Sequence, residues 1–116
     1  MKVTRIYSIE AAHSLRVPKT HKCSRVHGHN WTVAVTVEGI ESEDTGMVID
    51  FFDMDKAWQR VNDALDHQFL NNVAGLDNPT SEKMARWIWA ELSQALTGLC
   101  SVRVGENDRC YATLEK

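Results

Sequence analysis

Cysteine is scarce in this sequence and does not occur in close pairs. The 116 residues include three cysteines, Cys23, Cys100 and Cys110, with no C-x-x-C spacing. An odd number without a close pair argues against a disulfide framework and against a four-cysteine zinc site. At least one thiol is therefore expected to be free, and Cys100 and Cys110 are predicted to be small buried apolar residues.

Long apolar runs and an excess of positive charge are also absent. No stretch approaches the roughly 20 apolar residues that span a bilayer, and residues 1–5 lack the apolar block of a secretory signal, so we expect a cytoplasmic protein with no membrane partner. The formal net charge of −3 gives no general attraction to nucleic acid, which is not an expected partner. With 43% apolar residues, the chain is long enough for one core, so residues 1–116 are predicted to form a single domain.

Two segments in the first third of the chain alternate between apolar and polar residues, which is typical of half-buried strands. In residues 2–13 one face carries Val3, Tyr7, Ile9, Ala11 and His13. In the segment that begins at residue 27 one face carries His27, His29, Trp31, Val33, Val35 and Val37. A polar connection over residues 18–25 separates the two segments, which are predicted to pair as antiparallel strands.

The middle of the chain has helical periodicity. A helix is predicted to begin near Asp53, whose carboxylate can cap the first turn, and a second helix is predicted to begin after Thr80 and to end at Gly98. Their predicted buried stripes are Met54, Ala57, Trp58, Val61 and Leu65 in the first helix, and Ala85, Ile88, Trp89, Leu92 and Leu96 in the second. Two short strands, 101–106 and 109–115, are predicted to follow.

The resulting ββααββ order predicts an α+β fold, an antiparallel sheet with both helices on one face. Such a sheet has two exposed edge strands and one uncovered face. Pairing of edges between copies would remove that liability, so a homo-oligomer is expected.

His27-Gly28-His29 is the strongest candidate for a functional motif. In a strand, residues two apart point to the same side, about 6.5 to 7 Å apart, and His13 at the end of the preceding strand is predicted to lie beside them. Three neutral imidazoles are the ligand set of a catalytic zinc ion with an open fourth position. The glycine between two of them would let a ligand or metal approach the backbone.

Other interpretations of these residues stay open. An H-x-H pair can be two unrelated histidines, and Cys23 could be a fourth ligand in a closed structural zinc site. Lys22 and Arg25 beside Cys23 would favour its thiolate, the form that acts as a base, or they could be ordinary solvated loop residues.

Two further features are weaker candidates. Asp66 next to His67 could orient the imidazole and raise its basicity, although such a pair at a helix end is commonly a cap or a dipole interaction. Glu106 follows an otherwise apolar strand face and is either a turn residue or an anchor for a ligand.

Several motifs, in this order, resemble the 6-pyruvoyltetrahydropterin synthase superfamily, most of all its bacterial 6-carboxytetrahydropterin synthase branch, which acts in queuosine biosynthesis. They are Ala11-Ala12-His13, residues 21–29 (HKCSRVHGH), residues 46–51 (GMVIDF), Leu65-Asp66-His67, residues 78–82 (NPTSE) and Val104-Gly105-Glu106. The C-x-x-x-H-G-H element with an upstream A-A-H is the most specific. Ile9 departs from the phenylalanine that is frequent in the family, and the segment after Glu106 matches no family pattern.

The resemblance implies a tunnelling fold, in which subunits join their sheets around a barrel, with sites between subunits of a trimer or a dimer of trimers. It implies zinc on His13, His27 and His29, Cys23 as general base, His67 with Asp66 and Glu106 as the proton relay, and Glu106 also gripping the pterin substrate. Lys22 and Arg25 are candidate contacts of a triphosphate group.

The implied reaction converts 7,8-dihydroneopterin triphosphate to 6-carboxy-5,6,7,8-tetrahydropterin, acetaldehyde and triphosphate in a zinc-dependent lyase. The alternatives are a 6-pyruvoyltetrahydropterin product or a non-catalytic zinc- or pterin-binding module. A redox thiol protein is disfavoured because Cys23 has no resolving partner in the sequence.

Overall fold

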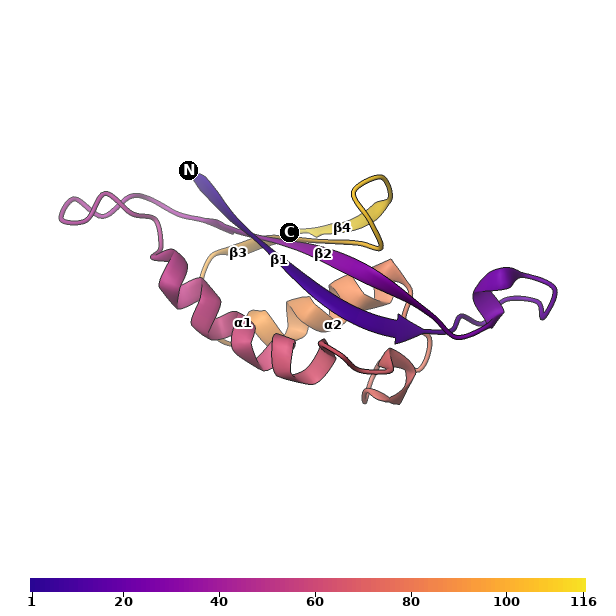
Figure 1. The fold of residues 1–116 in the computed structure, drawn as a ribbon. Coiled ribbons are helices and arrows are strands. Elements are labelled where there is room, and N and C mark those ends of the chain that lie inside the picture. Colours follow the sequence, from indigo (N-terminus) through magenta and orange to yellow (C-terminus); the bar gives the residue numbers. More distant parts are fainter.

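The computed structural model describes residues 1–116 and has the predicted element order. The elements are β1 (Lys2–His13), β2 (His27–Glu38), α1 (Phe51–Leu65), α2 (Ser81–Leu92), β3 (Leu99–Gly105) and β4 (Tyr111–Glu115), with short 3₁₀ turns η1 (Lys22–Ser24) and η2 (Leu70–Asn72). The strands form one antiparallel sheet in the order β1-β2-β3-β4, and both helices cover the same face of it (Figure 1). The α+β prediction is confirmed.

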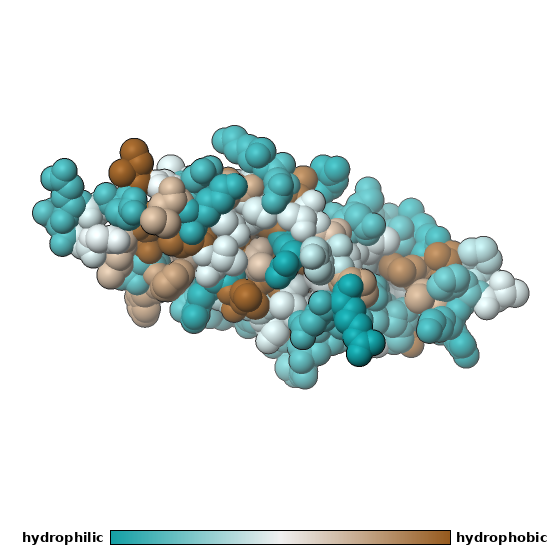
Figure 2. All heavy atoms as spheres, turned by 90° about the horizontal axis from the view of Figure 1, so that it is seen from above, coloured by the Kyte–Doolittle hydropathy of each residue, from teal (hydrophilic) through white to brown (hydrophobic).

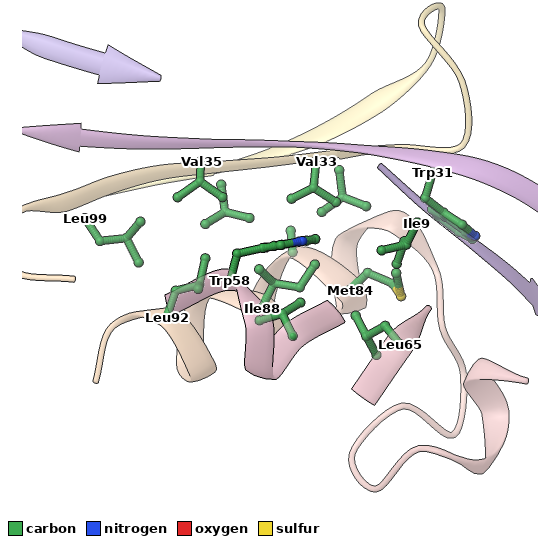
Figure 3. Packing of buried hydrophobic residues seen from close by; sticks show 14 of the residues in the cluster. Ile9, Trp31, Val33, Val35, Trp58, Leu65, Met84, Ile88, Leu92 and Leu99 are labelled. Carbon is green, nitrogen blue, oxygen red and sulfur yellow. The ribbon is translucent and has the colours of Figure 1, made fainter. Parts of the chain in front are cut away.

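The core lies between the sheet and the two helices (Figure 3). The inward face of β2 is buried because alternate residues point to the same side of a strand. Fully or almost fully buried side chains from the two central strands are Trp31, Val33, Val35, Val37, Val102 and Val104. The helices face them with Met54, Trp58, Val61, Leu65, Met84, Ala85, Ile88 and Leu92. Burial of each large aliphatic side chain contributes about 1.5–3 kcal/mol, so this layer holds the helices on the sheet.

The opposite face of the sheet is uncovered and largely polar. Thr4 on β1 and Thr36 on β2 share a hydrogen bond between their hydroxyl groups at 2.8 Å on this face. Across the surface seen in Figure 2, apolar side chains occur at separate places between hydrophilic ones. None of the helices has the length and apolar character needed to cross a membrane.

The predicted start of α1 at Asp53 is wrong by one turn. Asp50 is the N-cap: its backbone is extended, and its carboxylate accepts a hydrogen bond from the N–H of Phe52 at 2.9 Å. Asp53 already lies in the first helical turn, where its N–H donates to the carbonyl of Asp50. Two aspartates three residues apart both suit a helix start, and the backbone conformation decides between them. Thr80 caps α2 as predicted, through the N–H of Lys83.

The end of α2 also differs from the prediction. The helix ends at Leu92, and Leu96 is buried in the turn that follows. Gly98 has a φ of +85°, and a side chain there would come within 2.4 Å of the carbonyl oxygen of Glu38. This glycine therefore serves the entry into β3. Within the helix, Met84 is fully buried in the core, while Trp89 is only partly buried.

The prediction that Cys100 and Cys110 are buried fails for both residues. Cys100 is partly exposed, and Cys110 is exposed in the loop before β4, which begins at Tyr111 rather than at residue 109. The side chain of Asn107 accepts hydrogen bonds from the N–H groups of Arg109 and Cys110, so a turn replaces the predicted extension of the strand.

Candidate metal centre

The register of the first two strands brings three histidines to one end of the sheet. His13 and His27 are direct partners across the β1–β2 pair, and Ala11 is the partner of His29. Because residues two apart share a strand face, all three imidazoles lie on the same side. Their ring centroids are 4.6 Å apart for His13 and His27, 5.0 Å for His13 and His29, and 4.9 Å for His27 and His29.

The ring nitrogens of this cluster fit a metal ion. One nitrogen from each histidine lies within 4.8 Å of the others. Nε2 of His13 and Nε2 of His29 are buried without a hydrogen-bond partner, which is costly for a polar atom. Zinc binds imidazole nitrogen at about 2.0–2.1 Å, so small side-chain adjustments would bring three nitrogens onto one ion and satisfy both buried atoms.

The protonation states also favour metal binding. Burial lowers the pKa of His13 below its usual value, although the carbonyl of Pro79 opposes this shift. Burial likewise lowers the pKa of His29, with the carboxylate of Glu106 acting in the opposite direction. A metal ligand must be a neutral imidazole, and the buried site favours that form.

Two of the rings are fixed in orientation by backbone carbonyl groups. Nδ1 of His13 lies 2.8 Å from the carbonyl oxygen of Pro79, and Nδ1 of His27 lies 2.7 Å from that of Arg25. A carbonyl oxygen can only accept, so Nδ1 carries the proton in both rings and Nε2 keeps its lone pair for a metal. This arrangement is usual around metal-ligating histidines.

Glu106 lies directly beside the histidine nitrogens. Its carboxylate oxygens are 3.9 Å from Nε2 of His13 and 3.6 Å from Nε2 of His29, and its side chain is 29% exposed. It follows Gly105, the last residue of β3, so the end of the third strand adds an anion to the site formed by the first two. The carboxylate can still reach a bound molecule because it is open to solvent on one side.

Cys23 lines a hollow together with His27, His29 and Glu106, but it does not belong to the cluster of metal-ligand atoms. The hollow is lined by Lys22, Cys23, Arg25, Val26, His27, His29, Glu106 and Asn107. The cluster of ligand atoms consists of the three histidines alone, which favours an open site over a closed Cys-His-His-His site. The backbone of Cys23 is held in η1, where its N–H donates to Nδ1 of His21 and its carbonyl accepts from the N–H of Leu15.

His67 lines a different hollow of this chain. That hollow is lined by Glu10, Ala11, Ala12, Gly28, His29, Asn30, His67, Gln68 and Phe69, so it shares only His29 with the hollow that holds Cys23. Asp66 accepts a hydrogen bond from Nδ1 of His67 at 2.8 Å, and this contact raises the pKa of His67. His67 has a φ of +57°, a conformation that few residues other than glycine adopt.

Glu10 also lines this hollow, although the sequence pattern did not mark it as a candidate. Its carboxylate lies 3.6 Å from Nε2 of His67, and its backbone N–H donates to Asp66 at 2.9 Å, the main cause that lowers the pKa of Asp66. Glu10 occupies a polar position in an alternating strand, as any solvent-facing residue would, so the pattern gave no sign of a role. Gly28 lines this hollow too, so its backbone is open to a ligand there.

Comparisons with known proteins relate the chain to pterin enzymes. The family model described as 6-pyruvoyl tetrahydropterin synthase matches residues 2–116. A protein of Archaeoglobus fulgidus named putative 6-carboxy-5,6,7,8-tetrahydropterin synthase is 38% identical over 94% of this chain and 90% of its own length. The 6-carboxy-5,6,7,8-tetrahydropterin synthase of Synechocystis is 42% identical over 86% and 81% of the two chains. The dihydroneopterin monophosphate aldolase of Pyrococcus furiosus is 36% identical over 84% and 82%.

The fold agrees with solved structures as well. The structure of 6-pyruvoyl tetrahydropterin synthase from Caenorhabditis elegans superposes with a TM-score of 0.91 at 26% identity, covering 100% of this chain and 95% of that one. The subunit fold implied by the resemblance is thereby confirmed. With its four-stranded sheet, its cluster of three histidines and a family match over residues 2–116, the chain belongs to the 6-pyruvoyl tetrahydropterin synthase family.

Proposed function

We propose that residues 1–116 form a single-domain zinc lyase that converts 7,8-dihydroneopterin triphosphate and water to 6-carboxy-5,6,7,8-tetrahydropterin, acetaldehyde and triphosphate. The observation that carries the proposal is the cluster of His13, His27 and His29, two of which, His27 and His29, line a hollow together with Cys23 and Glu106. The names of the relatives from Archaeoglobus fulgidus and Synechocystis support the choice of product within the family.

The three histidines would hold the zinc ion through Nε2 of His13 and Nε2 of His29, the two buried nitrogens without partners, together with His27. Bound there with an open position, zinc would act as a Lewis acid toward the hydroxylated side chain of the substrate. Water is limited near His13 because its ring is fully buried.

Cys23 would act as the general base. It lies between Lys22 and Arg25 in the chain, and both of these cations line the hollow with it. The same two cations are suited to the anionic triphosphate group, with Arg25 able to bind two oxygens at once. A base at this place would remove a proton from the substrate side chain.

Glu106 would hold the pterin ring. A pterin has a guanidine-like edge with paired N–H donors, which match the two oxygens of a carboxylate. Glu106 is positioned next to the histidine nitrogens and partly open to solvent, so a ring bound there would have its side chain near the metal.

His67 would move the second proton, with Asp66 holding its imidazole through Nδ1. Because His67 and Cys23 line different hollows of one chain, we propose that a complete site combines Cys23 of one subunit with His67 of a neighbour in a homo-oligomer. Mixing Cys23→Ala and His67→Ala proteins after dissociation should then restore part of the activity. Mixtures that stay inactive, from variants that each assemble normally, would contradict a shared site.

The reaction is tested by incubating zinc-loaded protein without oxygen with 7,8-dihydroneopterin triphosphate and identifying the products by mass. Carboxytetrahydropterin with acetaldehyde is the expected result. A pyruvoyl product would assign the chain to the 6-pyruvoyltetrahydropterin branch. In a parallel incubation with dihydroneopterin monophosphate, cleavage of that compound together with an unchanged triphosphate would favour the aldolase activity for which the Pyrococcus relative is named. Unchanged substrate with bound pterin would favour a non-catalytic module.

A further inference from the structure

His13 is held at the point where strand pairing ends. It is the last residue of β1, and the β1–β2 register stops at the pair His13 and His27. The end of a strand normally loosens because its backbone groups lose their partners. The ring of His13 is nevertheless fully buried.

The segment between the two helices makes additional contacts with this strand end. The N–H of Ala12 donates to the carbonyl of Gln68 at 3.1 Å, and Nδ1 of His13 donates to the carbonyl of Pro79 at 2.8 Å. The N–H of Ser14 donates to the side chain of Asn71 at 2.9 Å. Three consecutive residues of the strand end are thus attached to residues 68–79.

Asn71 is the only one of the three partners within residues 68–79 that contributes its side chain, because Gln68 and Pro79 contribute backbone carbonyl groups. Its oxygen accepts from the N–H of Ser14, and its nitrogen donates to the carbonyl of Ser14 at 2.8 Å and weakly to the carbonyl of Asp77 at 3.5 Å. One amide therefore pairs both backbone groups of Ser14, as a neighbouring strand would. The preceding residue, Leu70, is fully buried, which fixes the segment that carries Asn71 to the core.

We propose that Asn71 is a positioning residue for the metal ligand His13, a role that rests on the zinc site of the proposed function. By closing the backbone of Ser14 onto the segment that ends at Pro79, it holds the ring of His13 against the Pro79 carbonyl. That contact keeps the proton on Nδ1 and directs Nε2 toward the other two histidines. Outer groups that orient a metal ligand are typically worth about 10- to 100-fold in metal affinity.

The test compares zinc affinity with fold stability in the purified protein. Asn71→Ala removes both hydrogen bonds between the Asn71 side chain and the Ser14 backbone, here called the clamp. Asn71→Asp keeps an acceptor for the N–H of Ser14 and loses the donor to its carbonyl. Asp50→Ala is the matched control, because it removes a helix cap that has no contact with His13. Zinc affinity is measured by competition with a chromophoric chelator, the ligand field by the visible absorption of bound Co²⁺, and stability by urea unfolding of the metal-free proteins.

Asn71→Ala is expected to weaken zinc binding about 10- to 100-fold and to change the Co²⁺ spectrum, with Asn71→Asp in between. Asp50→Ala is expected to lose stability with wild-type zinc affinity and spectrum. If Asn71→Ala and Asn71→Asp lower stability but keep wild-type zinc affinity and Co²⁺ spectrum, Asn71 is a structural clamp only and the inference is overturned. If Asn71→Ala does not fold, Asn71→Asp decides. Wild-type protein that binds no zinc would instead overturn the metal site of the proposed function, and the inference with it.

Discussion

His13 and His27 face each other across the β1–β2 pair, at the last position of their register, with their ring centroids 4.6 Å apart. This relationship links the strand pattern of the sequence to the chemistry of the site. Because side chains alternate along a strand, the pairing of His13 with His27 also places His29 on the same face, two residues further along β2. A slip of one residue in the register would turn the two imidazoles of β2 away from His13.

Replacing Cys23 distinguishes a catalytic thiol from a structural ligand. Cys23→Ala is expected to keep its zinc, because the sulfur lies outside the cluster of ligand atoms, and to lower kcat by about 10²–10⁴, the range for loss of a general base. Zinc content by metal analysis and turnover by product formation measure the two effects. A joint fall in zinc content and thermal stability would mean that Cys23 is a fourth ligand.

Replacing Glu106 tests whether it binds the pterin or the metal. Glu106→Gln keeps the size of the side chain and loses the charge, so KM is expected to rise about 10- to 100-fold, the equivalent of a charge-assisted hydrogen bond. Zinc affinity is expected to stay at the wild-type value. A lower zinc affinity with an unchanged KM would identify Glu106 as a metal ligand instead.

His67 gives a prediction about pH. The hydrogen bond to Asp66 and the nearby charges of Asp66 and Glu10 raise the pKa of His67. The folded protein therefore binds this proton more tightly than the unfolded chain, so any resulting stabilisation is present at low pH and is lost as pH rises through the folded pKa. NMR titration of the imidazole should give a pKa above the ordinary value of about 6.5, with a lower value in Asp66→Asn. A wild-type pKa at or below 6.5 would contradict the arrangement.

The helix start can be tested with a pair of aspartates. Asp50→Ala removes the side chain that caps α1 and is expected to cost about 1 kcal/mol in the free energy of unfolding. Asp53→Ala leaves the cap in place and loses only a favourable charge near the helix N-terminus, which is worth about 0.3–1 kcal/mol. Urea unfolding of both variants compares them. If Asp53→Ala lost more free energy of unfolding than Asp50→Ala, Asp53 would be the residue that caps α1.

The cluster of three histidines could be predicted from the sequence because side chains alternate along a strand with a period of two. Alternation in the two strands gives their faces, and antiparallel pairing brings His13 to the start of β2. The helices follow in the same way from their apolar stripes, as the buried residues Met54, Val61 and Ile88 show. The strand faces and the helix stripes can both be predicted because each depends on the spacing of residues that are close in the sequence.

Other parts of the site depend on contacts between distant segments, which no period reveals. Asn71 is one of several polar residues in a loop, and its pairing with Ser14 follows from where the chain packs between the helices. The family resemblance assigned Cys23 and His67 to one site between subunits, and within a single chain the two residues line different hollows. The sequence could not decide whether Asp50 or Asp53 caps α1, because both are aspartates and only the backbone conformation distinguishes them.

The most direct test of the central claim is whether activity follows zinc on the three histidines. Zinc is removed with a chelator, and turnover of 7,8-dihydroneopterin triphosphate is measured as zinc is added back to wild type and to His29→Ala. The account predicts no turnover without metal, full recovery in wild type at one zinc per chain, and no recovery in a folded His29→Ala protein. Full activity of the metal-free wild type, or zinc-restored activity in His29→Ala, would contradict it.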